Sequence, residues 1–451
     1  MAEAPNAAPP RPRRGEELEL EVGDLAHGGR GVARRDGYVV FVAGALPGDR
    51  VRARVDRRRR AFAEATAVEL LSASPERIEE RCRHGGEPCP GAPWQALPYE
   101  RQLAEKERQV GEALRRLGGL DGFALEPIVP AVETWRYRNK LEYTFGRGDR
   151  GLVLGFHRRG SWREILDAAG CLLASKRADA ARAAVLEWAD SHRIDPYDRG
   201  RGAGTLRNLV VREGRRSGQV QTRLVTSAAE IPRPPVDLHT MVEGPGGGTA
   251  GPTGALGAGR LVERIGGVEV EVSATAFLQT NTETADRLYE AVAEYADLRG
   301  GERLFDLYCG VGTIGLALAR RAGEVWGIES LPEAVADAER NAGRNAITNA
   351  RFVAADARAA VRPLLAEAGR PDVVVVDPPR AGLSKKVVRR LLECGARRIV
   401  YVSCNPTTLA PNAAQLGEGG YRLRRVRPVD MFPQTPHVEC VAELEQVAGS
   451  R

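Results

Sequence analysis

The sequence predicts an α/β protein with three folded parts, and three observations support this fold class. Apolar strands alternate with helical segments in the last third of the chain, which is typical of a doubly wound, Rossmann-like parallel sheet. Short strands separated by Gly, Pro and Asp turns occupy residues 15–72 and indicate an OB-like β-barrel. Strand and helix patterns are mixed between these two regions, which predicts a central α+β domain.

The composition indicates a protein with several domains and without a membrane segment. The 451 residues are enough for about three domains, and 43% of them are hydrophobic, which is sufficient for buried cores. No apolar run has the length of a membrane span, and residues 1–14 contain no hydrophobic signal stretch. We therefore expect a cytoplasmic monomer whose seven cysteines are free, catalytic or metal-bound rather than paired in disulfides.

The amino-terminal part combines a predicted barrel with clustered positive charge. Its strands alternate apolar and polar residues at 18–22, 38–42 and 50–55. An arginine run at 57–60 and the turn at 26–31 would give the barrel a cationic rim, which suits oligonucleotide-binding barrels. The net charge of +6 also favours an anionic partner such as nucleic acid, although an arginine-rich composition can equally follow from a GC-rich genome.

The expected domain organisation follows from these changes of pattern. Four segments are expected along the chain: a disordered tail at 1–14, an RNA-binding barrel at 15–72, a central domain with a cysteine loop and an RNA-contacting segment at 73–270, and the domain that carries the chemistry at 271–451.

The last of these segments has polar side chains at the ends of successive strands. A glycine turn at 310–313 leads from the first strand into a helix, a position where a ligand can approach the backbone. Glu329 closes the second strand and could accept both hydroxyls of a ribose, Asp356 follows the third and could receive the adenine side, and Asp377 closes the fourth. Such strand ends meet at one crevice of an open sheet. The alternative is that each acid only caps the helix after it.

The glycine pattern alone does not identify the ligand. Gly310, Gly312 and Gly315 complete a Gly-x-Gly-x-x-Gly motif, which is also the fingerprint of dinucleotide-binding sheets. Asp306 and Asp377 favour a methyl-donor nucleoside, because they place acidic groups near a cationic ligand, where a pyrophosphate would be repelled. A dinucleotide is the alternative ligand.

One cysteine near the end of the chain stands where a buried strand gives way to a helix. The apolar run at 399–403 ends just before Cys404, Asn405 suits a helix N-cap, and Pro406 suits the first helical position. Cys404 would thus face the positive end of a helix dipole, which lowers the pKa of a thiol and favours the nucleophilic thiolate. The alternative is a small buried cysteine that only fills the core.

Two features of the central region have a chemical interpretation. Cys82, Cys89 and Cys171 suggest a metal or iron–sulfur site, but such clusters usually take four thiolates, so a loop that binds nothing is an equal alternative. The segment at 135–140 interleaves aromatic and cationic residues, which suits stacking on bases and contact with phosphates, although a solvated strand would have the same composition.

The order of five motifs resembles the S-adenosylmethionine-dependent RNA 5-methyluridine methyltransferases over nearly the whole chain. These motifs are Phe277-Leu-Gln279-Thr-Asn281, Asp306-Leu-Tyr-Cys-Gly-Val-Gly-Thr313, Asp377-Pro-Pro-Arg380, Ser403-Cys404-Asn405-Pro406 and Asp430-Met-Phe-Pro-Gln-Thr-Pro-His437-Val-Glu439. Residues 23–32 and 45–49 resemble the TRAM domain, a small RNA-binding barrel. TRAM-bearing members are chiefly 23S rRNA enzymes, so the resemblance implies 23S rRNA as substrate ahead of tRNA.

The resemblance also implies the roles of individual residues. Cys404 would be the nucleophile and Glu439 the general base. S-adenosylmethionine would be the cofactor, in a site lined by Gln279, Tyr308, Thr313, Glu329, Asp356 and Asp377. These residue types fit the chemistry, because C5 of uracil accepts a methyl group only after a thiolate has added at C6, and a carboxylate must then remove the C5 proton.

The sequence departs from the family in its cysteine loop. The family pattern holds an iron–sulfur cluster with four cysteines, and Cys82, Cys89 and Cys171 match three of them. Ala92 stands where the remaining ligand is expected, and the spacing between the first two cysteines is longer by one residue. We therefore expect an incomplete iron–sulfur site, with a non-cysteine ligand or none at the fourth iron, or no cluster at all.

Two other functions remain open at this point. An amino-group methyltransferase also carries Asp-Pro-Pro at a fourth strand end, but its next residue is usually aromatic, and here it is Arg380. A non-catalytic RNA-binding protein could keep the fold, but it would have no reason to retain Cys404 and Glu439 together with the cofactor acids.

Overall fold

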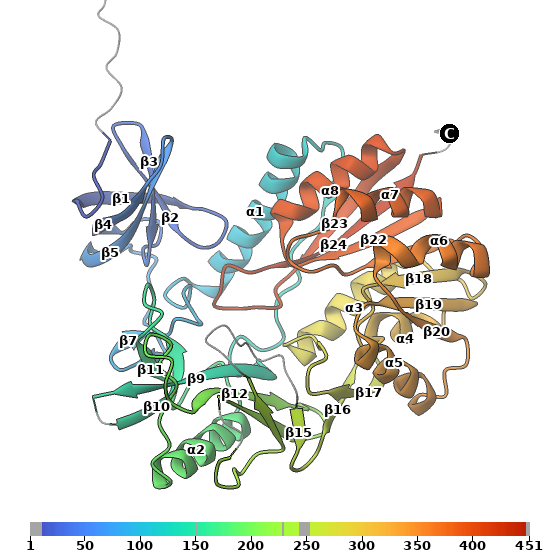
Figure 1. The fold of residues 1–451 in the computed structure, drawn as a ribbon. Coiled ribbons are helices and arrows are strands. Elements are labelled where there is room, and N and C mark those ends of the chain that lie inside the picture. Colours follow the sequence, from blue (N-terminus) through green and yellow to red (C-terminus); the bar gives the residue numbers. More distant parts are fainter. Residues whose placement is uncertain (1–10, 150, 228–229, 243–252, 448–451) are drawn as a thin grey trace, which may run out of the picture.

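The computed structural model describes residues 11–149, 151–227, 230–242 and 253–447. These residues form a barrel, a central sheet and a C-terminal sheet with helices on both faces (Figure 1). The fold class expected from the sequence is confirmed. Residues 1–10 of the expected tail lie outside the described residues. Among the helices that the structure describes, none combines the length and the apolar character that crossing a membrane requires.

The amino-terminal barrel closes in the strand order β1-β2-β3-β5-β4. Its core consists of the inward-facing residue of each alternating pair, such as Leu18, Leu20, Val40 and Val42. The β2–β3 hairpin turns at Asp36 and Gly37, which both have positive φ, as a tight hairpin turn requires. The barrel strands are β1 (Glu17–Leu25), β2 (Gly31–Arg35), β3 (Tyr38–Ala43), β4 (Arg50–Arg58) and β5 (Phe62–Ser72).

The central region is built on a seven-stranded sheet of order β11-β10-β9-β12-β13-β14-β15, with α2 (Lys176–Ser191) packed against it. A short hairpin of β6 (Arg83–His84) and β7 (Glu87–Pro88) carries the cysteine loop. The sheet strands are β9 (Lys140–Gly148), β10 (Gly151–His157), β11 (Ile165–Asp167), β12 (Leu206–Glu213), β13 (Val220–Thr226), β14 (Leu238–Met241) and β15 (Thr253–Ala255).

The C-terminal sheet has the order β20-β19-β18-β21-β22-β24-β23-β8. Strands β18 to β22 are parallel, and β24 runs antiparallel between β22 and β23. Its strands are β8 (Ala124–Leu125), β18 (Arg303–Leu307), β19 (Glu324–Glu329), β20 (Ala350–Ala354), β21 (Val373–Val376), β22 (Arg398–Ser403), β23 (Tyr421–Val429) and β24 (Glu439–Gln446).

Helices cover both faces of this sheet, and the period of two along each strand supplies a core to each face. On β21, Val374 and Val376 belong to one core cluster, whereas Val373 and Val375 belong to the other. The helices are α3 (Thr282–Ala296), α4 (Thr313–Ala319), α5 (Pro332–Arg344), α6 (Ala357–Ala368), α7 (Lys385–Cys394) and α8 (Pro406–Glu418).

Two segments within residues 73–270 pack with the C-terminal sheet. Helix α1 (Tyr99–Gly118) lies beside α8, as Figure 1 shows, and β8 pairs with β23. The hairpin of β16 (Arg260–Ile265) and β17 (Val268–Ser273) is joined to α5 by Asn341, whose side chain accepts from the amide of Glu271 at 2.7 Å. We propose that residues 99–125 and 260–447 form the C-terminal unit.

The barrel is attached beside the loop that leads to Glu439. Leu25 and Leu46 of the barrel share a small apolar cluster with Trp94. Gly29, in the β1–β2 turn, lies so close to Pro436 that a Cβ on Gly29 would be 2.9 Å from the proline ring. The barrel therefore borders the part of the C-terminal unit where the predicted chemistry is located.

Candidate active site

The predicted cofactor residues converge on a pocket at the carboxyl end of β18. Four of them line it: Gln279, Tyr308, Thr313 and Asp377. The sequence interpretation missed Tyr289, whose hydroxyl donates to Oγ1 of Thr313 at 2.9 Å, because nothing in its helical pattern distinguishes it from a core residue. Switch points of open α/β sheets bind ligands at this edge.

Backbone conformation explains the glycines of the turn. Gly310 and Gly312 have φ values of 55° and 84°, and Tyr308 adopts the same left-handed region at 66°. Gly315 is required for a different reason: its amide donates to Oδ2 of Asp306 at 2.8 Å, and a Cβ there would lie 2.9 Å from that oxygen. The glycine-rich loop thus packs the N-terminal end of α4 against the end of β18.

Glu329 and Asp356 occupy the next two strand ends with different environments. Glu329 accepts from the amides of Gly310 at 3.2 Å and Leu331 at 2.9 Å, so its carboxylate is held beside the glycine turn. Asp356 is exposed, caps α6 through the amide of Arg358 at 2.8 Å, and is ion-paired with the guanidinium of the same arginine. Neither Glu329 nor Asp356 is among the residues that line the pocket.

Of the two aspartates at the centre of the site, Asp306 is fully buried and Asp377 is half-buried, and this burial changes their ionisation. Burial raises the pKa of Asp306 to about 7, and the neighbouring charges of Asp377 and Glu329 act in the same direction. Burial likewise raises the pKa of Asp377 to about 7, although Gln279, which donates to it at 3.4 Å, opposes the shift. A cationic ligand would stabilise both carboxylates, whereas a pyrophosphate would not.

Cys404 and Glu439 are neighbours across two paired strands. In the antiparallel register of β22 and β24, Ser403 is opposite Cys440. Cys404 follows directly after β22 and Glu439 is the first residue of β24, so both residues lie next to this last pair at the carboxyl edge. The charge of Glu439 raises the pKa of Cys404, which agrees with the two side chains being close in space. Tertiary structure therefore pairs a thiol with a carboxyl group.

The local structure around Cys404 agrees with the sequence, but its ionisation does not. Asn405 caps α8, accepting from the amide of Thr407 at 3.1 Å, and Pro406 begins the helix. The pKa of Cys404 is nevertheless raised to about 11, by burial first and then by the charges of Glu439 and Asp377, while Arg380 acts in the opposite direction. The expected lowering of this pKa is therefore wrong for the free protein, because burial and the charges of two acids raise the pKa by more than Arg380 lowers it.

Glu439 is buried, with 4% of its surface exposed. Burial raises its pKa well above the usual value, and the charge of Asp377 raises it further. Burial thus favours the protonated form of this side chain relative to an exposed carboxyl group, and a nearby cation would favour the carboxylate.

The loop between β23 and β24 is held by buried polar contacts. The Nζ atom of Lys106, in α1, donates to Oδ1 of Asp430 at 2.5 Å, and both side chains are completely buried. Tyr99 donates to the other oxygen of Asp430 at 2.9 Å. Removing one partner of such a pair costs about 3–5 kcal/mol. Sequence reasoning missed Lys106, because a lysine on a helix is usually an exposed residue.

Cationic side chains gather where this loop approaches Cys404. Burial lowers the pKa of His437 to about 4, and the charges of Arg380, Arg138 and Lys106 lower it further. Arg380 also acts on His27 of the barrel. A positive field beside the thiol and the carboxyl group suits a phosphate of a polynucleotide.

The segment 135–140 is an internal connection rather than an RNA-contacting surface at two of its positions. Tyr137 is fully buried and its hydroxyl donates to the carbonyl of Pro433 at 3.1 Å. Asn139 is buried and donates to the carbonyl of Gln279 at 2.8 Å. The expectation of base stacking is wrong for these residues, because they link the central sheet to the cofactor motif and to the loop before Glu439.

The predicted cysteine loop is a compact cluster with a fourth member. Cys82, Cys89 and Cys171 are buried together with His84, and one side-chain atom of each lies within 4.8 Å of the others. Ala92, at the position of the missing cysteine, is also buried. Sequence reasoning missed His84, although the Cys-x-His spacing, which places both residues at one end of a hairpin, could have indicated it.

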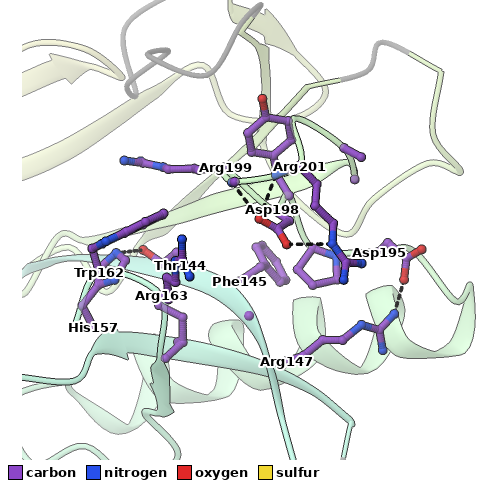
Figure 2. A pocket seen from close by; sticks show the side chains of 17 residues that line it. Thr144, Phe145, Arg147, His157, Trp162, Arg163, Asp195, Asp198, Arg199 and Arg201 are labelled. Carbon is purple, nitrogen blue, oxygen red and sulfur yellow. Dashed lines mark hydrogen bonds and ion pairs between the residues drawn. The ribbon is translucent and has the colours of Figure 1, made fainter.

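A second concave surface lies on the central sheet, away from the strand ends described above. It has a volume of about 700 Å³ and contains four arginines and two aspartates. Figure 2 shows Trp162 and Arg163 on one side and Arg199 and Arg201 on the other. The guanidinium of Arg163 lies 4.6 Å from the ring of Trp162, which is 55% exposed. Exposed aromatic and cationic groups of this kind suit single-stranded nucleic acid.

The fold and the acid-lined pocket define the class of the protein as an S-adenosylmethionine-dependent methyltransferase. The comparisons with known proteins agree. A family model described as tRNA (uracil-5-)-methyltransferase matches residues 268–447, and the TRAM domain model matches residues 11–68. The chain belongs to the family of S-adenosylmethionine-dependent RNA uracil-5-methyltransferases.

Relatives of similar length support this assignment. An uncharacterized RNA methyltransferase of Halalkalibacterium halodurans is 36% identical over 444 residues, which cover 95% of this chain and 96% of the relative. One of Nitratidesulfovibrio vulgaris is 36% identical over 452 residues, which cover 95% of this chain and 96% of the relative. The solved structure of Pyrococcus abyssi tRNA (uracil-54, C5)-methyltransferase, in complex with S-adenosyl-L-homocysteine, is 29% identical with a TM-score of 0.76, covering 95% of this chain and 100% of that one.

Activity is expected to rise with pH, because the proposed nucleophile and base must both lose a proton and both have raised pKa values. Arg380→Gln should move this rise to higher pH, since Arg380 is the cation that lowers the pKa of Cys404. The pH profile of kcat/KM measures the effect. Arg389→Gln, an exposed arginine of α7, is the control. An unchanged profile for Arg380→Gln would exclude this electrostatic role.

Proposed function

We propose that this protein methylates C5 of a uridine in RNA, with Cys404 as the nucleophile and Glu439 as the general base. The observation that carries this proposal is the position of Cys404 and Glu439 at adjoining strand ends, where the charges of Glu439 and of the pocket residue Asp377 both act on the thiol. An attacking group and a proton acceptor must both reach one pyrimidine ring, and two groups at adjoining strand ends meet this requirement.

The reaction would proceed in two covalent steps. The Cys404 thiolate adds to C6 of uracil, and the ring electrons move to give an enolate with a nucleophilic C5. S-adenosylmethionine supplies the methyl group to C5 and is released as S-adenosylhomocysteine. The Glu439 carboxylate then takes the proton from C5, the C5–C6 double bond re-forms, and the thiolate of Cys404 leaves. The uracil must be unstacked to reach both groups.

We assign the six expected cofactor residues as follows. Gln279, Tyr308, Thr313 and Asp377 would contact S-adenosylmethionine in the pocket, and Glu329 would bind the ribose hydroxyls beside the glycine turn. Asp356 would contact the adenine only after its ion pair with Arg358 opens, because the carboxylate is engaged in the free protein. Asp306, which is buried, and Asp377, which is half-buried, fit a sulfonium cation.

We propose 23S rRNA as the substrate, and tRNA as the second candidate. The TRAM match supports an rRNA enzyme through the family resemblance of TRAM-bearing chains. The Pyrococcus abyssi structure favours tRNA, because that protein is named for a tRNA uracil and its match covers 95% of this chain. Mass-spectrometric mapping of 5-methyluridine in rRNA and tRNA from a strain without this protein decides between them. If both RNAs keep all of their 5-methyluridine in that strain, the proposed function is contradicted.

Two basic surfaces are expected to add salt-dependent RNA affinity. Arg57, Arg58 and Arg60 are exposed on the barrel, and Arg163 and Arg199 lie in the central concavity. Neutralising either set to glutamine should weaken RNA binding and flatten its salt dependence by about 0.7 in log–log slope for each phosphate that the variant no longer neutralises. Fluorescence anisotropy with rRNA fragments at several salt concentrations measures both quantities.

The control for this experiment is Arg320→Gln with Arg321→Gln, two exposed arginines after α4. They lie at the end of α4 farther from the glycine turn, so we expect no change in RNA binding. S-adenosylmethionine affinity should be unchanged in all variants. A barrel variant with the wild-type affinity and salt slope would show that this rim does not bind RNA.

A further inference from the structure

The buried cluster in the cysteine loop contains donors suited to a metal ion that the methyl-transfer chemistry does not use. We propose that Cys82, His84, Cys89 and Cys171 bind a single Zn²⁺ in a tetrahedral site with three thiolates and one imidazole. The site joins the β6–β7 hairpin to the loop before α2.

The spacing of the donor atoms supports one ion. A tetrahedral zinc site with Zn–S bonds of about 2.3 Å and Zn–N bonds of about 2.0 Å places neighbouring donor atoms roughly 3.5–4 Å apart. In this cluster, Sγ of Cys82 is 3.5 Å from Nε2 of His84, and all four donors lie within 4.8 Å of one another. Small inward movements would bring the donors to bonding distance of a central ion.

The same spacing disagrees with the iron–sulfur cluster that the family resemblance implies. In a four-iron cluster each protein ligand binds a different iron, with the inorganic core between the ligands, so the ligands must stand farther apart than those of one ion. Ala92 supplies no donor, and the donor that is present, His84, lies beside Cys82 in the same tight group. These residues do not fit a four-thiolate cluster.

The surroundings resemble a structural metal site. The amide of Leu172 donates to Sγ of Cys82 at 3.4 Å, which would stabilise a thiolate. The Gln95 side chain accepts from the amide of Cys82 and donates to its carbonyl, both at 2.8 Å, so the backbone of this ligand is fixed. All four donors are buried, which leaves no open position for a substrate and indicates a closed, structural site.

A metal at this site would stabilise the connection to the active site. The segment after Cys171 is paired with the segment 135–140, where the amide of Arg136 donates to the carbonyl of Leu172 at 2.6 Å. Tyr137, in that segment, donates to Pro433 in the loop before Glu439. The ion would thus hold the central domain in the arrangement that positions the catalytic loop.

Elemental analysis of the full-length protein tests the proposal. Protein purified anaerobically from medium that contains both metals should hold one zinc per chain, without stoichiometric iron or acid-labile sulfide. Co²⁺ exchanged into the site should show the visible bands of tetrahedral, thiolate-bound cobalt. His84→Ala and Cys171→Ser should lower zinc content at least tenfold and reduce Tm, because metal binding contributes to folding.

Two further variants keep the result interpretable if a ligand substitution prevents folding. His84→Cys keeps four donor side chains in the cluster and should retain zinc. His192 lies outside the cluster, so His192→Ala should leave zinc content and Tm unchanged. Four irons and four sulfides per chain in the wild-type protein would overturn the proposal, and so would a protein free of any metal. Neither result would bear on the methyltransferase function, which is assayed separately.

Discussion

Cys404→Ala is expected to lower methyl transfer to RNA by at least about a thousandfold, because the uracil ring loses the group that activates its C5. Affinity for S-adenosylmethionine should stay nearly unchanged, since Cys404 is not among the residues lining the cofactor pocket. Incorporation of a labelled methyl group measures the first quantity, and isothermal titration measures the second.

A matched substitution separates this loss from a general effect of removing a buried thiol. Cys394 is a buried core cysteine at the end of α7, and Cys394→Ala should retain methyl transfer although it loses some stability. Methyl transfer near the wild-type rate in Cys404→Ala would exclude the covalent mechanism. A strong loss of cofactor affinity in that variant would instead show that the substitution disturbs the whole edge of the sheet.

Glu439→Gln is expected to reduce turnover by about 10²- to 10⁴-fold, the usual contribution of a general base. The amide can neither take the C5 proton nor complete the release step, so the methylated ring should remain bonded to Cys404. The expected readout is a slowly migrating protein–RNA band on a denaturing gel, formed only when S-adenosylmethionine is present.

The double variant Cys404→Ala with Glu439→Gln should form no such band, because the adduct requires the thiol. The Glu439→Gln substitution should preserve folding, because glutamine has nearly the same shape as glutamate and places no ionisable group in this buried position. Normal turnover without an adduct in Glu439→Gln would assign proton removal to a different group.

The raised pKa values of Cys404 and Glu439 give these two predictions a common physical basis. Burial and the charge of Asp377 favour the protonated form of both groups. A cationic methyl donor next to Asp377 would offset the negative charge that disfavours the thiolate. Ionisation of the thiol would therefore accompany cofactor binding. The thiol would thereby stay in its less reactive, protonated form until the cofactor binds.

Features that depend on local pattern could be predicted from the sequence. Alternation of apolar residues indicated the barrel strands, and the alternation of apolar strands, such as 303–307 and 373–376, with helical segments indicated a doubly wound parallel sheet. The N-cap Asn405 and the helix start at Pro406 were predicted because capping depends on adjacent residues. The cofactor class and the family followed from motifs whose residues are close together in the chain.

Features that depend on distant residues emerged only from the folded arrangement of the chain. The pKa of Cys404 is raised because the thiol is half-buried and because the charges of Glu439 and Asp377 act on it, although these acids are 35 and 27 residues away in the sequence. Tyr137 was expected to contact RNA, but it is buried and its hydroxyl donates to the carbonyl of Pro433. Lys106 can be buried because its ammonium group forms an ion pair with Asp430. His84 joins the cysteines only once Cys171 is folded against the hairpin. The burial of a side chain and the pKa of its ionisable group depend on all the residues that surround it in space. A local sequence pattern does not contain this information.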